Sequence, residues 1–384
     1  MSPPSVTVSD RGRKRLKGKH PWVFSNEIAA KPEVPPGAMV EVRDERGHFL
    51  GAGTYNPHTL IAVRILTYHG PFDLASRIAA AVEMRTRLYG AGLCRLVYGE
   101  SDGLPGLIAD RYGDTLVVQI LTAGMELMKD DVVRFLTESA KPARILLRND
   151  SAYRKLEGLG TESLWVLGEP ADTVIIETGG LKLAVNLAGG QKTGFFLDQQ
   201  ENRARVAAYA RGSRFLDAFA YTGAWAMAAA RAGLTRITAV DSSEEALAGA
   251  ARNAELNGYS ITTVADDVFE FLRKKYSTPE RYDMIVLDPP AFCKSRKQVG
   301  EALKGYREIN LRAMKLLDRA GVLFTCSCSQ PVTPDLFLDM LRDAASDSGR
   351  AFALRELRLH PPDHPVLLHF PESLYLKCAI LELV

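Results

Sequence analysis

The sequence predicts an α/β protein with a doubly wound, mostly parallel sheet, preceded by a small β-rich domain and a central α+β domain. Three observations predict this fold class. Strand-like and helix-like segments alternate from about residue 180, short strands broken by turn residues fill the N-terminal region, and mixed patterns lie between. A chain of 384 residues is long enough for two or three domains. We expect them at 1–70, 71–172 and 173–384.

The N-terminal segment 37–66 alternates apolar and polar residues, which is typical of half-buried strands. Gly51, Gly53 and Asn56-Pro57 interrupt it as turn residues do. We expect a small antiparallel barrel or sandwich.

The middle of the chain mixes helical and hairpin patterns. Apolar residues recur at helical spacing over 73–90, which begins with Asp and ends with Gly. A hairpin-like stretch at 94–121, a helix near 126–139 and a strand at 143–150 follow. These segments predict an α+β domain.

The C-terminal half alternates strands and helices. The expected strands are 213–219, 236–241, 261–267, 282–290 and 321–327, and the expected helices are 224–233, 243–258, 268–276 and one near 302–317. Ligands of such sheets bind outside the carboxyl ends of the strands. Four strands end in Asp217, Asp241, Asp288 and the pair Cys326 and Cys328, so we expect a site there.

Composition narrows the class of protein. Hydrophobic residues make up 46% and charged residues 24%, as in ordinary soluble proteins. Five cysteines without regular spacing argue against a disulfide framework, and the Cys326-x-Cys328 pair has no matching Cys/His pair for zinc. The N-terminus has no apolar signal-like core and no run reaches a membrane-spanning length. We predict a reduced cytoplasmic protein without metal or membrane association.

Basic residues gather in two places although the net charge is only +2. Segment 10–20 carries six Lys/Arg, and segment 293–297 is followed by Lys304 and Arg307. Either cluster alone is most simply a solvated surface. Two clusters together favour a polyanionic partner, because phosphate neutralisation supplies most non-specific nucleic-acid affinity.

The turn after the first C-terminal strand indicates the cofactor. "DAFAYTGAW" (217–225) has one glycine, Gly223, and lacks the G-x-G-x-x-G cradle for a pyrophosphate, which argues against NAD and FAD. It suits S-adenosylmethionine, with Asp241 on the ribose hydroxyls and Asp267 on the adenine amino group. Capping of a helix N-terminus is the alternative role for each Asp, although it explains all three poorly.

Segment 286–292, "VLDPPAF", ends a strand with an acid and two prolines. The prolines stop strand pairing and stiffen the turn. We interpret it as a platform for a flat nucleobase, with Asp288 on the base edge and Pro290 and Phe292 as packing surfaces. A rigid loop with a solvated Asp is the alternative.

The two cysteines differ in expected environment. Residues 326 and 328 point to one face of a strand, and if the strand ends near Ser327, Cys326 is inside the sheet and Cys328 lies in the cleft. Cys326 then behaves as a small buried hydrophobe. A thiolate at Cys328 can add to carbon 6 of a cytosine and make carbon 5 nucleophilic, which is covalent catalysis. Nearby Lys or Arg would favour the thiolate.

With these motifs, the chain resembles the RlmI-like family of bacterial 23S ribosomal RNA cytosine-5 methyltransferases over nearly its whole length. The matching motifs are "KGKHPWVFSNEI", "GAGTYNP", "GGQKTGFFLDQQENR", "FLDAFAYTGAW", "VDSS", "LNG", "DDVFEFL", "DPPAF", "GYREIN", "FTCSCS" and "HPVLLHFPESLYLK". The resemblance implies an RNA-binding PUA domain at 1–70, a central domain at 71–172 and a class I (Rossmann-like) methyltransferase domain at 173–384. It also implies S-adenosylmethionine and 23S ribosomal RNA, in the large subunit or an assembly intermediate, as cofactor and partner. We also consider a homodimer.

The resemblance places the nucleophile at Cys328, with Asp288 as a second catalytic residue. It implies cofactor contacts at Gln199, Arg203, Asp217, Phe219, Tyr221, Gly223, Asp241, Ser242, Asp267 and Asp288. The expected substrate contacts are Pro289, Pro290, Phe292, Lys294 and Tyr306.

Two departures from the family pattern affect these expectations. Gln200 stands where the family commonly has Arg. Ala291 stands where other RNA cytosine-5 methyltransferases carry a second Cys, and Cys293 lies two residues further on. The base that removes the carbon-5 proton is therefore open, with Asp288 and a water as alternatives.

The sequence is also compatible with two other functions. One is methylation of an exocyclic base nitrogen, which uses a similar acid- or Asn-Pro-Pro motif and needs no cysteine. The other is a non-catalytic RNA-binding or ribosome-assembly factor that retains the fold.

Overall fold

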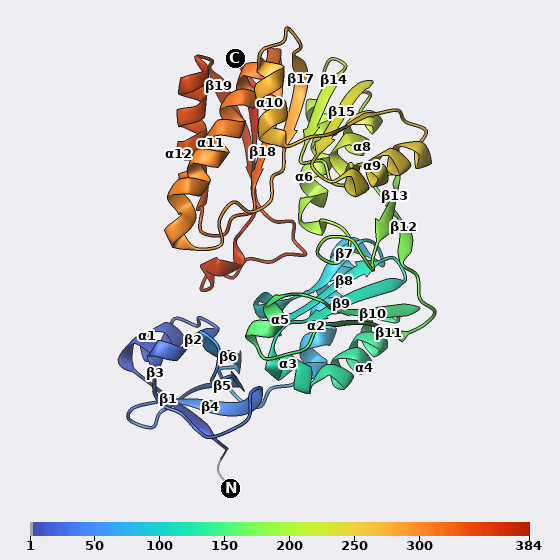
Figure 1. The fold of residues 1–384 in the computed structure, drawn as a ribbon. Helices are drawn as coiled ribbons and strands as arrows, with labels where there is room; N and C mark the ends of the chain where they lie inside the picture. Colours follow the sequence, from blue (N-terminus) through green and yellow to red (C-terminus); the bar gives the residue numbers. More distant parts are fainter. Residues whose placement is uncertain (1–2) are drawn as a thin grey trace. The chain divides into compact units, whose positions relative to one another are not determined.

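The computed structural model describes residues 3–384, which form two compact units (Figure 1). Unit 1 contains the residues up to Val174, together with Val185–Leu197 and Pro362–Ser373. Unit 2 contains Ile175–Ala184, Asp198–Pro361 and Leu374–Val384. The segments predicted as two domains, 1–70 and 71–172, thus both belong to unit 1. In residues 3–384, no helix combines the length and the apolarity that crossing a membrane requires.

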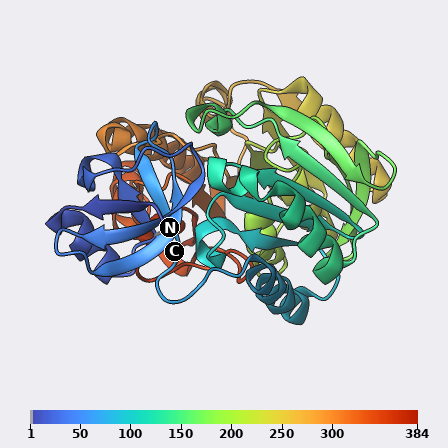
Figure 2. The same cartoon turned by 90° about the horizontal axis from the view of Figure 1, so that it is seen from below.

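Unit 1 begins with a six-stranded sheet, coloured blue in Figure 2, of order β2-β6-β5-β4-β1-β3. Its elements are β1 (Ser5–Val8), α1 (Asp10–Lys17), β2 (Trp22–Phe24), β3 (Ile28–Ala30), β4 (Ala38–Asp44), β5 (Phe49–Tyr55) and β6 (Ile61–Thr67). The pairs β4–β5 and β5–β6 are antiparallel, as the alternating pattern predicts, whereas β1 and β4 are parallel. Gly53 lies at a bulge where a Cβ would come within 2.1 Å of the Arg64 carbonyl oxygen, so only glycine fits there.

The second sheet of unit 1 has the order β11-β10-β9-β8-β7. Its strands are β7 (Cys94–Tyr98), β8 (Leu107–Tyr112), β9 (Thr115–Ile120), β10 (Arg144–Asn149) and β11 (Glu162–Leu167), and the helices are α2 (Leu74–Tyr89), α3 (Ala123–Leu127), α4 (Lys129–Ala140) and α5 (Tyr153–Leu156). Helix α2 begins where the sequence predicts, because the Asp73 carboxylate accepts a hydrogen bond from Ser76 N at 3.1 Å. It ends at Gly90, which has a φ of 62°. The helix predicted near 126–139 corresponds to α4, which the separate short helix α3 precedes.

The C-terminal segment Pro362–Ser373 completes unit 1. Asp363 accepts a hydrogen bond from Arg95 N at 2.8 Å through its carboxylate, and its backbone carbonyl accepts one from the buried Arg85 at 3.0 Å. The Phe370 ring packs edge-on against Trp22 with centroids 4.7 Å apart. Residues near the end of the sequence therefore belong to the core of the N-terminal unit.

Unit 2 is built on a seven-stranded sheet of order β16-β15-β14-β17-β18-β20-β19. Its strands are β14 (Arg214–Ala218), β15 (Arg236–Asp241), β16 (Thr262–Ala265), β17 (Tyr282–Leu287), β18 (Leu317–Ser327), β19 (Phe352–Arg358) and β20 (Lys377–Leu383). Its helices are α6 (Gln200–Ala204), α7 (Val206–Tyr209), α8 (Ala224–Arg231), α9 (Glu244–Leu256), α10 (Val268–Tyr276), α11 (Val299–Leu316) and α12 (Pro334–Ser348). A separate hairpin pairs β12 (Thr173–Thr178) with β13 (Leu181–Asn186).

The topology of this sheet creates a switch point at β14. Strands β15 and β16 extend the sheet on one side of β14, and β17 and β18 extend it on the other, all in parallel. Strand β20 then inserts antiparallel between β18 and β19. Because the connections leave β14 and β17 in opposite directions, a crevice at their carboxyl ends is the expected ligand site.

Candidate active site

The turn after β14 holds two non-glycine residues in the left-handed region, Phe219 (φ 65°) and Tyr221 (φ 47°), followed by Gly223 (φ 75°). Its N–H groups are used internally: Ala220 N donates to the Val240 carbonyl at 3.0 Å and Tyr221 N to the Asp241 carboxylate at 2.9 Å. The turn therefore offers no cradle for a pyrophosphate. Strained backbone of this kind costs about 1–3 kcal/mol per residue and clusters at ligand sites.

Asp217, on β14, is fully buried, and only one of its two carboxylate oxygens accepts a hydrogen bond from the described residues. Its Oδ2 accepts a hydrogen bond from Ala226 N at 2.9 Å, whereas its Oδ1 has no hydrogen-bond partner within residues 3–384. Burial raises the pKa of this carboxyl well above its usual value, and the Asp288 and Asp241 carboxylates raise it further. A buried unpaired acceptor is costly, so this atom fits a ligand that brings a hydrogen-bond donor.

Asp288 follows β17 and joins several side chains at the switch point. It accepts hydrogen bonds from Gln199 Nε2 at 2.7 Å and from Trp225 Nε1 at 2.9 Å. Burial raises its pKa despite these two hydrogen bonds. Arg203 is buried nearby, and burial lowers its pKa to about 10 against the opposing effects of Asp288, Asp198 and Asp217. Sequence reasoning missed Trp225; its place just after the Gly223 turn was the available signal.

The remaining predicted cofactor residues lie at the ends of β15 and β16. Asp241 is half-buried, and each carboxylate oxygen accepts one backbone N–H, from Tyr221 at 2.9 Å and from Ser243 at 3.0 Å. A carboxylate can accept about four hydrogen bonds, so Asp241 has capacity left for hydroxyl groups. Ser242 is exposed. Asp267 is exposed and accepts a hydrogen bond from Glu270 N at 3.1 Å, so it caps the N-terminus of α10.

The environments of Cys326 and Cys328 differ as the strand geometry predicts. Strand β18 ends at Ser327. Cys326 is 1% exposed and lies opposite Cys378 of β20, and burial raises its pKa well above the usual value. Cys328 is partly exposed, whereas the other four cysteines are buried. Its Sγ lies 3.7 Å from the Pro289 carbonyl oxygen, so the thiol adjoins the Asp-Pro-Pro turn.

Helix α11, strand β20 and the loop after β17 all contact Ser329, the residue after Cys328. The Ser329 hydroxyl lies 2.9 Å from the Tyr306 hydroxyl of α11 and accepts a hydrogen bond from Cys293 N at 3.2 Å. Lys377, the first residue of β20, donates from Nζ to the Ser329 carbonyl at 2.8 Å. Sequence reasoning gave Lys377 no role, because it lies far from Ser329 along the chain; the available signal was its place as the last residue of the matching motif 364–377.

The structure corrects one predicted substrate contact. Tyr306 is 0% exposed, so its side chain supports Ser329 from the core and does not reach a substrate. Phe292 is half-buried, with its ring 4.4 Å from that of Tyr306, so much of its surface packs in the core. Pro289 is buried, whereas Pro290 and Lys294 are exposed beside the turn.

The two basic clusters differ in how far their charges are paired. In α1, Arg13 and Lys14 pair with Asp10, and Arg11 and Arg15 pair with the buried Glu27. In the second cluster, Lys304 pairs with Glu301 and Arg307 with Asp347. The basic loop, defined as Lys294, Arg296 and Lys297, is exposed and makes no ion pair with the described residues. Its charges are available to a partner.

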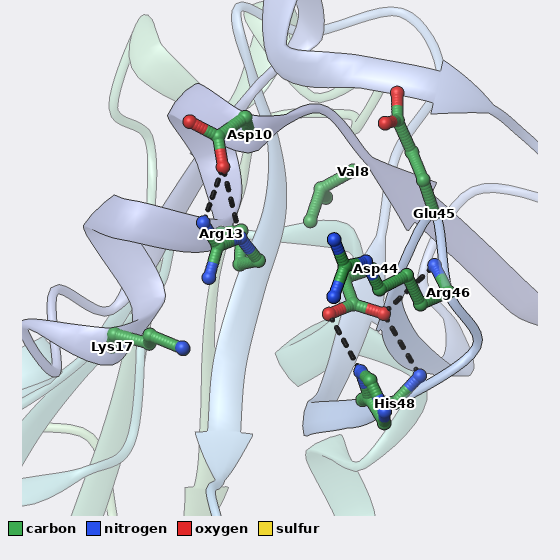
Figure 3. A pocket seen from close by; sticks show the side chains of 8 residues that line it. All are labelled: Val8, Asp10, Arg13, Lys17, Asp44, Glu45, Arg46 and His48. Atoms are coloured by element: carbon green, nitrogen blue, oxygen red, sulfur yellow. Dashed lines mark hydrogen bonds and ion pairs between the residues drawn. The ribbon is translucent and has the colours of Figure 1, made fainter.

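Unit 1 contains a pocket of about 300 Å³ between α1 and the turn that joins β4 to β5 (Figure 3). Its lining includes Val8, Asp10, Arg13, Lys17, Asp44, Glu45, Arg46 and His48. Arg13 pairs with Asp10 at 2.5 Å, and His48 contacts Asp44 at 3.0 Å. Acidic and basic groups thus largely neutralise one another, and the pocket lacks the thiol and the strand-end carboxylates described above. Within residues 3–384, no three His, Cys, Asp or Glu side chains are placed to hold a metal.

Comparison with known proteins identifies the class of protein. Residues 146–367 match the S-adenosylmethionine-dependent methyltransferase family, and residues 6–68 match a PUA-like domain. A putative S-adenosylmethionine-dependent methyltransferase from Streptococcus mutans has the same fold, with a TM-score of 0.83, 20% identity, and coverage of 99% of this chain and 100% of that one. A structure of SMU.776, a putative methyltransferase complexed with SAH, superposes with a TM-score of 0.83 at 19% identity, over 99% of this chain and 100% of that one. The chain is a methyltransferase that uses S-adenosylmethionine.

Curated relatives define the family more narrowly. Ribosomal RNA large subunit methyltransferase I of Klebsiella pneumoniae (strain 342) is 38% identical over 97% of both chains. The protein of the same name from Cronobacter sakazakii is 39% identical over 96% of this chain and 97% of its own. The chain belongs to this ribosomal RNA large subunit methyltransferase I family.

Proposed function

We propose that the protein methylates carbon 5 of a cytosine in 23S ribosomal RNA through a covalent adduct with Cys328. The observation that carries this proposal is the position of Cys328. It is the partly exposed cysteine of the chain, at the carboxyl end of β18 and 3.7 Å from the Pro289 carbonyl oxygen of the Asp-Pro-Pro turn. The exocyclic-nitrogen alternative gives no role to a thiol at this place.

The reaction uses the thiolate as a temporary nucleophile. The Cys328 sulfur adds to carbon 6 of the cytosine, and the electrons of the 5,6 double bond make carbon 5 nucleophilic. Bound S-adenosylmethionine supplies an electrophilic methyl group. After carbon 5 is methylated, a base removes its proton, the double bond re-forms, and the bond from sulfur to carbon 6 breaks to restore the thiolate. Asp288, with its raised pKa, and a water are the candidate bases.

The residues at the strand ends fit the cofactor. In our proposal the Asp217 Oδ1 accepts a hydrogen bond directly or through a water, the Asp241 carboxylate binds ribose hydroxyls, and the turn 219–223 packs against the ligand. Gln199 and Arg203 fix Asp288 at the edge of this site, and Ser242 and Asp267 border the adenosine.

Ribosomal RNA as the substrate is supported by the names of the relatives and by the basic loop. Lys294, Arg296 and Lys297 follow the Asp-Pro-Pro turn directly, so they suit phosphates that flank the target base. The PUA-like domain supplies a second module of a kind associated with RNA binding.

Replacing Lys294, Arg296 and Lys297 together by Ala is expected to weaken RNA binding and reduce its dependence on salt. The slope of log K against log salt is negative, and each lost phosphate contact reduces its magnitude by about 0.7–0.9, so we expect the magnitude to fall by about 2–3 for the three residues. Fluorescence anisotropy with an RNA fragment from 50 to 300 mM KCl measures the affinity and its salt dependence. In methylation assays we expect KM to rise more than kcat falls. The matched control is Lys304→Ala with Arg307→Ala, because these residues are paired with carboxylates. An equal change of slope in both variants would refute the special role of the basic loop.

A further inference from the structure

Lys377 is an unusual residue for the interior of a sheet. It is 0% exposed at the start of β20, opposite Ser327 of β18. Its Nζ donates to the backbone carbonyls of Ser329 and Tyr375, both at 2.8 Å. No carboxylate of residues 3–384 forms an ion pair with it. A buried ammonium without a counter-charge is costly, so something must offset its charge.

The titratable groups around Lys377 are two thiols and a phenol, and each of them becomes an anion only when it loses its proton. Cys328 follows β18, Cys293 follows β17, and the Tyr306 hydroxyl of α11 lies on the other side of Ser329. Burial lowers the pKa of Lys377 to about 8, and Cys328 and then Cys293 oppose this effect. At pH 7 the ammonium is therefore mostly charged. Cys293 is only 3% exposed, which leaves Cys328 as the neighbouring thiol that a substrate can reach.

We propose that Lys377 is a positioning residue whose ammonium is the counter-charge of the Cys328 thiolate and fixes the turn that presents this sulfur. The inference rests on the proposed role of Cys328 as nucleophile. The two carbonyls hold Nζ next to the backbone of Ser329, one residue beyond the thiol. Attraction between the ammonium and the thiolate stabilises the reactive form, and the same attraction returns the sulfur as a thiolate when the adduct breaks down.

The test measures the thiolate directly. Iodoacetamide alkylates exposed thiolates, and because the other four cysteines are buried, the reaction in the folded protein reports on Cys328, with the site verified by mass spectrometry. We expect Lys377→Met to move the midpoint of the rate–pH curve upward by about one unit, which lowers the rate at pH 7 about tenfold. Lys377→Arg retains most of the wild-type midpoint, and the exposed Lys304→Met leaves it unchanged. A folded Lys377→Met protein with an unchanged midpoint and only a lower Tm would overturn the proposal.

A second measurement holds even if Lys377→Met does not fold. In protein labelled with ¹³C at the lysine Cε, the titration of Lys377 is followed by NMR in wild type and in Cys328→Ala. Loss of the thiolate is expected to lower the Lys377 midpoint, because the coupling between two charges is reciprocal. Equal midpoints would contradict the proposal. Both measurements are made without RNA, so they can succeed even if Cys328→Ala retains methylation, an outcome that would refute the proposed covalent reaction alone.

Discussion

Cys328→Ala is expected to abolish methylation, with a loss of kcat of at least about 10³-fold, while binding of S-adenosylmethionine is retained. The loss follows because the variant has no nucleophile to activate carbon 5, and removal of a covalent nucleophile is among the most severe active-site changes. Cofactor binding is expected to survive because the strand-end carboxylates Asp217, Asp241 and Asp288 lie on β14, on β15 and directly after β17, not on the segment that carries Cys328. Transfer of a labelled methyl group to RNA measures the first effect, and isothermal titration measures the second.

The adduct itself provides a stricter test of Cys328. RNA with 5-fluorocytosine carries no removable proton on carbon 5, so the wild-type enzyme is expected to remain attached after methyl transfer and to run as a shifted band on a denaturing gel. Cys328→Ser is not expected to form the band. The matched control is Cys326→Ser, because Cys326 has the same residue type two positions earlier but is buried. Trapping by Cys328→Ser would assign the nucleophile to another cysteine, and full methylation by Cys328→Ala would favour attack by an exocyclic nitrogen.

Asp288→Ala is expected to cost about 2–6 kcal/mol of stability and at least about 10²-fold in kcat/KM. The variant leaves Gln199 Nε2 and Trp225 Nε1 without their acceptor, and each unpaired buried donor costs about 1–3 kcal/mol. Displacement of these side chains misplaces the reactants, and small misplacements cost about 10²-fold in rate. Thermal unfolding, cofactor titration and methylation assays measure the three effects.

Asp283 supplies the control for Asp288, because it lies near the opposite end of β17. Its carboxylate accepts hydrogen bonds from Ser213 N and Arg214 N, both at 2.8 Å. Asp283→Ala is therefore expected to lower Tm but to leave kcat/KM of the folded protein nearly unchanged. Equal losses of kcat/KM in the two variants would show that Asp288 acts through stability alone.

Asp288 also predicts a dependence on pH. Because burial raises its pKa, the carboxylate takes up a proton at a higher pH than an exposed Asp does. If cofactor binding requires the charged Asp288 carboxylate, the affinity is highest above the raised pKa of Asp288. It then falls as the pH is lowered through that pKa. Titrations of wild type and Asp288→Asn between pH 4 and 8 are expected to differ in slope, with the variant flatter. Parallel curves would contradict this role.

Local patterns were sufficient to predict much of unit 2. Each expected strand from 213 to 327 and each expected helix from 224 to 317 has a counterpart, because every element carries its own periodicity and ends in turn residues. The parallel alternation also placed Asp217, Asp241, Asp288 and Cys328 at one edge of the sheet. The different burial of Cys326 and Cys328 followed from where β18 ends.

Contacts between distant parts of the chain could not be predicted from local sequence patterns. Lys377 lies next to Ser329 only because β20 inserts antiparallel between β18 and β19, and no local pattern indicates that pairing. Tyr306 was placed at the substrate by its motif, whereas helix α11 turns it into the core. The assignment of Val185–Leu197 to unit 1 also depends on tertiary packing.

The position of Pro362–Ser373, near the end of the sequence but within unit 1, has a consequence for biosynthesis. The nascent chain emerges from the ribosome N-terminus first. The first residues of unit 1 are therefore synthesised long before Pro362–Ser373, against which they pack. Until then Arg95 N lacks the Asp363 carboxylate and Trp22 lacks the Phe370 ring. A fragment that stops at Val174 would show the same gap permanently, and a prematurely terminated chain would expose apolar surface that chaperones and proteases recognise.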